Sequence, residues 1–286
     1  DFCQLYNAAL EQRIAAYQRR RVSLHYKDQA AELKATRAAH DDLARWSYSA
    51  EQQVLRKLEK TFAAFFGRIR RGAKPGFPRF RARDRYHAAD FRVGDGLTIR
   101  KSGKLGFVGV LGEIRVRWHR SLPSAPPKSA ILSRQAGKWY VVFHVEVEQV
   151  ARSSSDSVGI DFGLTSLVAL STGKTETRPN WTKRAAKALR IRQRAVARCK
   201  RGSATRRKRV AALARFSGRI TAKRRDFCHK LTRGLVDRYG RIAIEDLNIK
   251  GLARGMHAKH VHDAAWAQIA AMLRYKAANA GGECIE

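Results

Sequence analysis

Val158-Gly-Ile-Asp-Phe-Gly-Leu-Thr-Ser-Leu-Val-Ala-Leu170 is the stretch that decides the fold. It predicts two short apolar strands on either side of a tight turn at Gly163. Another short strand is predicted from Arg241 to Asp246, and a last helix from Asp263 to Ala280. Strands on both sides of a helical insertion indicate a mixed sheet with helices packed on it. The residues from 151 to 286 are therefore predicted to form an α/β domain.

A strongly basic segment lies between these strands. From Lys183 to Arg233 the chain has 20 Lys and Arg residues against a single acid, Asp226. Apolar residues recur through it at helical spacing, so we predict two basic amphipathic helices joined near Gly202-Ser203. A segment with this charge would repel itself unless it faced a polyanion.

The whole chain is basic as well. Its 286 residues include 59 Lys and Arg against 24 Asp and Glu, a formal net charge of +35 at pH 7. This charge predicts a polyanionic partner, and nucleic acid is favoured because phosphate neutralisation by Lys and Arg releases counterions. A membrane is not favoured, because no run approaches the roughly 18 apolar residues of a spanning helix and no signal-peptide pattern opens the chain.

The cysteines show no metal-binding pattern. Cys3, Cys199, Cys228 and Cys284 lie far apart, without a pair or a Cys/His cluster of zinc-ligand spacing. We therefore expect free thiols, no zinc in this chain and a cytoplasmic location.

The N-terminal half predicts two further domains. Apolar residues at steps of three and four favour helices, so residues 1–70 are assigned to a helical lobe. The basic segment that follows contains Gly and Pro residues, which end helices and mark a boundary between domains. Residues 71–150 alternate short apolar runs with Gly and Pro, which predicts a small antiparallel β-barrel. The expected strands are Leu97–Arg100, Leu105–Val110, Ile114–Trp118, Ala130–Ser133 and Trp139–Val147, the last with one well-buried face.

Two acids are candidates for catalysis. Asp161 interrupts an apolar strand, and Glu245 closes another. A carboxylate flanked by buried strand residues is costly to ionise unless a cation or hydrogen-bond donors compensate it. Mg²⁺ prefers carboxylate oxygens, and two such ions about 3.5 to 4 Å apart can promote phosphodiester hydrolysis. On spacing alone the alternative stays open that both acids are strand-end residues that face solvent or cap a helix.

The residues around these acids resemble a known family. Val158–Thr165 looks like the first catalytic motif of RuvC-type nucleases, which have an RNase H-like fold, and Ile244–Leu252 is similar to their second motif. Flanking segments resemble the TnpB (OrfB) proteins of insertion sequences, relatives of type V CRISPR effectors. In the family's order along the chain, these segments are Leu5–Arg13, Gly76–Phe80, Arg225–Thr232, Asp263–Trp266 and Leu273–Lys276.

The resemblance implies an RNA-guided DNA endonuclease with guide RNA and target DNA as its partners. It implies that Asp161 and Glu245 hold Mg²⁺, at a two-metal site in the complete protein. It also implies a recognition lobe over residues 1–70, a wedge-like nucleic-acid-binding barrel over 71–150 and an incomplete RuvC-like nuclease domain over 151–286. The basic residues expected to bind nucleic acid are Lys74, Arg79, Arg81, Lys183, Arg184, Lys187, Arg206, Arg207, Lys208, Arg224, Arg225 and Lys230.

The sequence departs from the family pattern near its end. The family carries a third catalytic Asp after a four-cysteine zinc ribbon, and neither is found here. We therefore expect a chain that is cut at both ends, either an excerpt of a longer natural protein or the product of a truncated gene, and that cleaves weakly or not at all by itself. Asp263 is a poor substitute, because its setting fits a helix N-cap or first turn better. Asp246 should point away from Glu245 on a strand.

Three functions follow from these observations. The first is an RNA-guided nuclease, and the second is a guide-programmed DNA-binding protein that does not cut. The third, which the ordered motifs disfavour, is an unguided basic RNA-binding or chromatin-like protein. A recombinase role in transposition is also disfavoured, since no residues suggest a nucleophilic Tyr or Ser.

Overall fold

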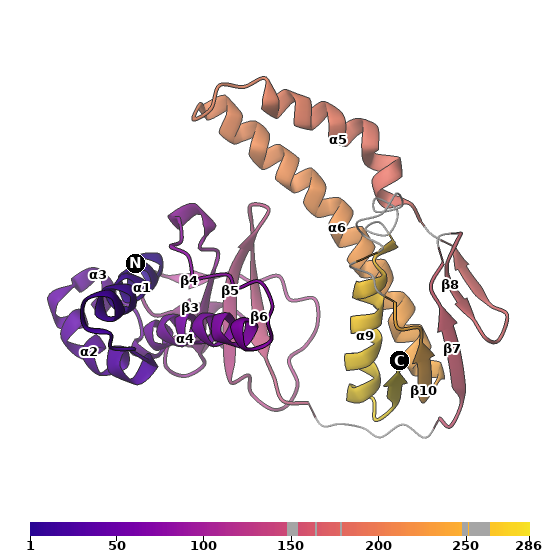
Figure 1. Ribbon diagram of the computed structural model, residues 1–286, viewed down its shortest axis with the longest axis horizontal. Helices are drawn as coiled ribbons and strands as arrows, with labels where there is room; N and C mark the ends of the chain where they lie inside the picture. The colour runs from indigo at the N-terminus through magenta and orange to yellow at the C-terminus, as the bar shows by residue number, and fades with distance from the viewer. Residues whose placement is uncertain (148–153, 164, 178, 248–250, 252–263) are drawn as a thin grey trace. The chain divides into compact units, whose positions relative to one another are not determined.

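The computed structural model describes the chain except residues 148–153, 164, 178, 248–250 and 252–263 (Figure 1). The chain divides into two compact units, Asp1–Val147 and Glu148–Glu286. The first unit contains helices and antiparallel sheets, and the second contains a mixed sheet with helices. The protein is therefore of the α/β class, as predicted from the sequence.

Residues 1–70 are helical, as the apolar spacing predicted. The helices are α1 (Phe2–Arg20), α2 (Tyr26–Ala39), α3 (Asp41–Ala44) and α4 (Tyr48–Arg70). Helix α4 begins after Ser47, whose Oγ accepts a hydrogen bond from the Ala50 amide at 3.3 Å, an N-cap that satisfies a free donor of the first turn. Leu10, Leu33 and Leu58 are fully buried where α1, α2 and α4 meet.

The rest of the first unit consists of a 3₁₀ turn, η1 (Arg83–Arg85), and two three-stranded antiparallel sheets. One sheet has the order β1-β5-β6, with β1 (Ala88–Arg92), β5 (Ser129–Gln135) and β6 (Lys138–His144). The other has the order β2-β3-β4, with β2 (Leu97–Ile99), β3 (Leu105–Phe107) and β4 (Glu113–Ile114). Phe91, Leu105 and Phe107 bury their side chains between the sheets and Ala50 of α4.

Two expectations for these sheets were wrong. Residues 115–118 are not a strand, because β4 ends at Ile114. The alternating residues of β6 do not form a well-buried face: Trp139 is 63% exposed, and Val141 and Phe143 are only half-buried. Sequence alternation predicts that one face of a strand differs from the other, but it does not predict how much of that face other elements cover, and β6 is one of the two edge strands of its sheet.

The second unit is built on a five-stranded sheet of order β11-β10-β7-β8-β9. Strands β7 and β11 run parallel to β10, while β8 and β9 are antiparallel, so the sheet is mixed as predicted. The strands are β7 (Ser157–Asp161), β8 (Ser166–Leu170), β9 (Thr175–Thr177), β10 (Arg241–Ile244) and β11 (Glu283–Ile285).

In the described part of this unit, three long helices accompany the sheet. They are α5 (Trp181–Ala197), α6 (Ala204–Arg238) and α9 (Trp266–Asn279). Helix α9 runs beside the end of α6, as Figure 1 shows. Residues of both helices share an apolar core with β7 and β10. Helices α5 and α6 form the predicted basic pair. They are joined at Gly202, whose φ of +83° favours glycine, and at Ser203, whose Oγ accepts a hydrogen bond from the Arg206 amide at 3.1 Å.

Candidate active site and nucleic-acid interface

The sheet of the second unit brings the two predicted catalytic acids together. Strands β7 and β10 are parallel neighbours, with Ile160 opposite Ile244. Asp161 is the last residue of β7, and Glu245 directly follows β10. The two acids are therefore each one residue beyond the Ile160–Ile244 pair. Neighbouring strands lie about 4.8 Å apart. Two carboxylates separated by more than 80 residues of sequence therefore end adjacent strands at one edge of the sheet.

Both acids lie on the face of the sheet opposite the core. Ile160 and Ile244 are 4% and 5% exposed and belong to the apolar core. Because side chains alternate along a strand, the following residues project to the other face, and both Asp161 and Glu245 are exposed. The residues that precede the two acids are buried, as the sequence argument assumed, but the carboxylates themselves are exposed, so a cost of burial does not apply to them. Exposure leaves the oxygens accessible to a ligand.

A glycine fixes the turn that follows Asp161. A Cβ atom on Gly163 would lie 2.7 Å from the carbonyl oxygen of Ser166, so a larger residue cannot fit without moving the backbone. Phe162 is 7% exposed and anchors the turn in the core. Asp161 pairs with Ala169 of β8, so it lies on a strand that is flanked by β8 and β10.

The two carboxylates could provide part of the ligand set of a hard divalent cation. Within the described part of the chain, the side chains of Asp161 and Glu245 form no hydrogen bond or ion pair with protein, so their oxygens are available. Carboxylates are preferred ligands of Mg²⁺. Among the described residues, no cluster of three His, Cys, Asp or Glu could hold a metal ion. Asp246 is exposed next to Glu245, and Asp263, with its predicted N-cap role, lies outside the described residues.

The predicted nucleic-acid contacts on α5 and α6 form a basic helical hairpin. No residue of α5 is buried, and the buried residues of α6 begin only at Cys228. Lys230 of α6 is exposed, and its Nζ is paired with the Asp226 carboxylate at 2.8 Å. Most of the others are exposed and two are half-buried: exposed are Lys183, Arg184, Lys187, Arg207, Lys208 and Arg225, and half-buried are Arg206 and Arg224.

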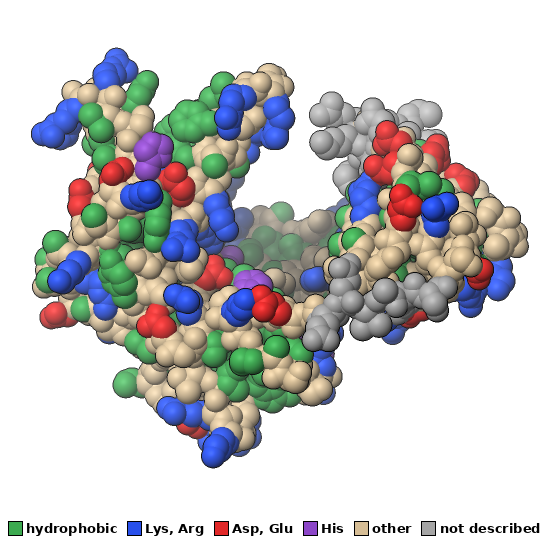
Figure 2. Space-filling model, turned by 90° about the horizontal axis from the view of Figure 1, so that it is seen from below, with side chains coloured by type: hydrophobic (Ala, Val, Ile, Leu, Met, Phe, Trp, Pro, Cys, Tyr) green, Lys and Arg blue, Asp and Glu red, His purple; other side chains and the backbone are tan. Residues whose placement is uncertain are grey.

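The predicted contacts in the first unit lie beside an aromatic cluster that sequence reasoning missed. Lys74, Arg79 and Arg81 are exposed. Phe77 is 49% exposed, and its ring centroid lies 5.3 Å from that of Phe65 of α4. On the face that Figure 2 shows, basic side chains lie beside exposed hydrophobic ones over the first unit. Exposed aromatic rings among basic residues are typical of surfaces on which nucleobases stack. The alternation of Phe with Arg in residues 77–81 was the available signal.

Comparison with known proteins identifies the family. The family model for OrfB of IS605 elements, described as "Probable transposase", matches residues 140–256, which include both acids and the hairpin. A protein of Streptomyces pristinaespiralis, named as an RNA-guided DNA endonuclease, is 36% identical over 289 residues, covering 98% of this chain and 70% of the relative. The chain belongs to the TnpB (OrfB) family. The resemblance predicted from the ordered motifs is thus confirmed.

A second relative and a solved structure agree with the TnpB assignment. The InsQ protein of Escherichia coli (strain K12), also named as an RNA-guided DNA endonuclease, is 28% identical over 252 residues, covering 82% of this chain and 61% of the relative. Cas12f1, in a cryo-EM structure of a Cas12f1–sgRNA–target DNA complex, matches with a TM-score of 0.57 at 12% identity. That match covers 100% of this chain and 70% of Cas12f1, and it is a likeness of fold.

No helix in the described part of this TnpB-family chain is both long enough and apolar enough to cross a membrane. The four cysteines are free thiols, with Cys3 and Cys228 buried.

Proposed function

We propose that this TnpB-family protein is an RNA-guided DNA endonuclease that binds a guide RNA and a target DNA. The observation that carries the proposal is the register of β7 and β10, which sets Asp161 beside Glu245 at one edge of the sheet. The names of the two curated relatives support the same reaction. The chain spans 70% and 61% of their lengths.

The two carboxylates would hold Mg²⁺, which when bound supplies an activated water and stabilises the leaving oxygen of the phosphodiester. The chain's own residues contribute position and charge. The parallel strands fix the separation of Asp161 and Glu245, and the exposed face gives a phosphodiester access to them. The basic hairpin of α5 and α6 offsets the repulsion between these acids and the DNA backbone, because its Lys and Arg residues attract phosphate.

The division of labour follows the family resemblance. Residues 1–70 would form the recognition lobe, residues 71–150 the wedge-like barrel built from the two antiparallel sheets, and residues 151–286 the RuvC-like nuclease domain. The lobe and barrel would bind the guide RNA and the guide–target heteroduplex, and sequence would be chosen mainly by base pairing with the guide. The basic charge of the chain, +35 in total, supports contacts to phosphate in each part.

Plasmid cleavage by the natural protein with its guide RNA and Mg²⁺ tests this function. Asp161→Ala and Glu245→Ala should each lower cleavage by at least about a hundredfold, because each removes half of the carboxylate pair. Glu176→Ala is the matched control, since Glu176 is an exposed carboxylate on β9 of the same sheet. Guide-dependent binding of the target in a gel-shift assay should remain in all three variants.

A guide-programmed DNA-binding protein that does not cut is the second candidate. It is favoured by the absence of a third metal-binding side chain among the described residues. If the unmodified protein binds its guide and shifts the target but leaves the plasmid intact, this second function replaces the first.

A further inference from the structure

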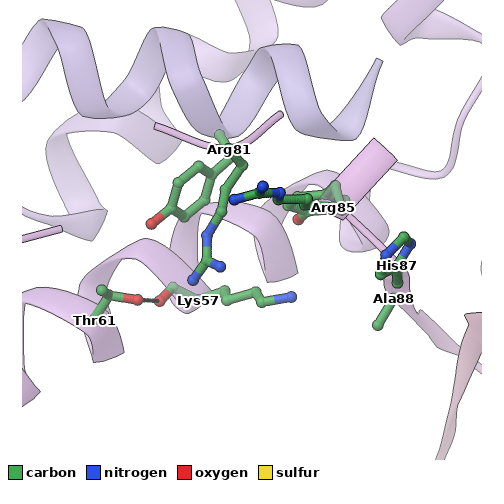
Figure 3. Close-up of a pocket in the computed structure, with 8 residues that line it drawn as sticks. Lys57, Thr61, Arg81, Arg85, His87 and Ala88 are labelled. Carbon is green, nitrogen blue, oxygen red and sulfur yellow. Dashed lines mark hydrogen bonds between the residues drawn. The ribbon is translucent and has the colours of Figure 1, made fainter. Parts of the chain in front are cut away.

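A cavity in the first unit combines several cations with two tyrosines (Figure 3). Its volume is about 130 Å³, and it lies between α1, α4 and the segment that leads through η1 into β1. The residues that line it include Tyr6, Lys57, Arg81, Arg85 and Tyr86. None of the described residues that line the cavity is an acid.

The wall that carries Arg81 is held in place by a side-chain amide. Asn7 of α1 donates a hydrogen bond from Nδ2 to the Arg81 carbonyl oxygen at 2.9 Å, and its Oδ1 accepts one from the Arg81 amide at 2.8 Å. The amide therefore pairs with the extended backbone as a neighbouring strand would. This pairing fixes the position at which the Arg81 guanidinium meets the cavity, and Figure 3 shows that side chain extending toward Lys57.

The cations rest on aromatic rings. Lys57 Nζ lies 4.8 Å from the centroid of the Tyr86 ring, and Arg81 Cζ lies 6.0 Å from the centroid of the Tyr6 ring. These distances are typical of cation–π contacts, which orient a cation without neutralising its charge. Lys57, Arg81 and Arg85 form no ion pair with any residue that the structure describes, and Asp90 is the acid that acts on Lys57, so the cavity keeps a net positive charge.

The surroundings of Lys57 act on its pKa in both directions. Burial lowers the pKa of its ammonium group, Asp90 raises it, and Arg81 lowers it to a smaller extent than Asp90 raises it. An anion in the cavity would stabilise the charged ammonium group further.

A buried hydroxyl also lacks a partner here. Tyr6 is 1% exposed, and its Oη is buried without a hydrogen bond. Buried hydroxyl groups in folded proteins nearly always find a partner, because losing water without a replacement costs stability. Tyr6 lines the cavity, so a ligand there could accept the missing hydrogen bond.

We propose that this cavity binds a phosphodiester group of a nucleic-acid backbone, with Lys57, Arg81 and Arg85 around the phosphate and the Tyr6 hydroxyl as a donor to it. The inference deepens the proposed function, because it assigns one backbone contact to a defined site. Phosphate is the shared chemistry of the guide RNA and the target DNA, and the test distinguishes these two sources.

The variants Lys57→Gln and Tyr6→Phe test the cavity, and Lys60→Gln is the matched control. Lys57→Gln and Lys60→Gln each remove one positive charge from an exposed position of α4, but only Lys57 lines the cavity. Tyr6→Phe removes only the unpartnered oxygen, so the fold should be retained and the midpoint of urea unfolding should not fall. The probes are a short fluorescent single-stranded RNA and the single-stranded DNA of the same sequence.

Binding is measured by fluorescence anisotropy over a range of salt concentrations, without Mg²⁺. Lys57→Gln should weaken binding of at least one probe about tenfold and lower the slope of log K against log salt by about 0.7, the value of one phosphate contact on a single strand. Tyr6→Phe should weaken the same probe severalfold with little change in slope, because it removes a donor and no charge.

The outcomes are distinct. A loss confined to RNA assigns the site to the guide, a loss confined to DNA assigns it to the target, and a loss of both supports a phosphate site that accepts either. The inference is overturned if Lys57→Gln matches Lys60→Gln and Tyr6→Phe binds as well as the unmodified protein. Because no cleavage is measured, a failure of the proposed nuclease activity leaves this result unaffected.

Discussion

Helix α6 belongs to two regions that are stabilised in different ways. Its last part contributes Cys228, Thr232, Leu235 and Val236 as buried residues, and three of these join the core under the mixed sheet. Its longer first part buries nothing and runs beside α5, which buries nothing either. One continuous helix is therefore a core element at one end and an exposed basic arm at the other (Figure 1).

The two regions show how charge and burial divide a structure. The core region excludes water from apolar side chains, which is the main source of folding free energy. The hairpin has partly exposed contacts instead, such as that of the exposed Arg192, whose Cζ lies 4.1 Å from the centroid of the half-buried Phe216 ring. Its surplus of Lys and Arg would be opposed by self-repulsion in isolation. We therefore expect a polyanion to stabilise the hairpin and to have little effect on the core.

Removing a core isoleucine should have the largest effect on stability. Ile269 is 0% exposed within the core, and Ile269→Ala should lower the free energy of unfolding by about 3 kcal/mol through lost burial and a residual cavity. Ile191→Ala on α5, where Ile191 is 58% exposed, should change it by less than about 0.5 kcal/mol. Urea unfolding measures both, and equal losses would contradict the distinction between core and hairpin.

Removing charge from the hairpin should affect binding and leave folding intact. The triple variant Arg206→Gln, Arg207→Gln, Lys208→Gln should lower the slope of log K against log salt by about 2 to 3 for double-stranded DNA, if all three contact phosphate. Its unfolding free energy in urea should stay within about 0.5 kcal/mol of the unmodified protein. A slope that does not change would show that this end of the hairpin faces solvent.

Much of this contrast could be predicted from sequence. Apolar alternation and turn residues are local signals, so β7, the Gly163 turn and the break between α5 and α6 were placed correctly. The pairing of Asp161 with Glu245 could be expected from the motif resemblance, although their exposure on the open face could not. Exposure depends on which face of the sheet the helices cover, and that is settled by packing between distant segments.

Other features required the structure because they arise from contacts that are distant in sequence. The half-buried face of β6 depends on which residues of other elements pack against Val141 and Phe143. The cavity beside Arg81 is formed by α1, α4 and a loop, and its Asn7 anchor lies 74 residues from Arg81. No window of sequence contains both ends of such a contact.

Two single lysines on α6 should differ in binding although both are exposed. Lys223 has no acidic partner among the described residues, and Lys230 is paired with Asp226. Lys223→Gln should lower the salt slope on double-stranded DNA by about 0.9, the value of one lost phosphate contact. Lys230→Gln should lower it by about half of this or less, because its charge is already shared. The same titration by anisotropy measures both, and a larger effect of Lys230→Gln would contradict this order.

The smallest expected effect is a change in the free energy of unfolding at alkaline pH, and it arises from the contact between α6 and α9. Lys276 of α9 donates hydrogen bonds from Nζ to the His229 carbonyl oxygen and to Thr232 Oγ1, both at 2.7 Å. Burial lowers the pKa of this ammonium group, Arg233 lowers it further, and Asp237 partly opposes the change.

The sign follows from proton binding in the two states. With a lowered pKa in the folded protein, the unfolded chain binds more protons between the folded pKa and 10.5, so this group makes stability rise with pH in that interval. Cys228 acts oppositely, because burial raises the pKa of its thiol above 9.0. Subtracting the unfolding free energy of Lys276→Met from that of the unmodified protein, measured in urea from neutral pH to 10.5, removes most of the cysteine contribution. This difference in unfolding free energy should be constant near neutral pH and rise at alkaline pH. A difference that falls with pH would show that the folded protein stabilises the charged form of Lys276. The contact between α9 and α6 would then depend on the charge of the lysine and not on neutral hydrogen bonds.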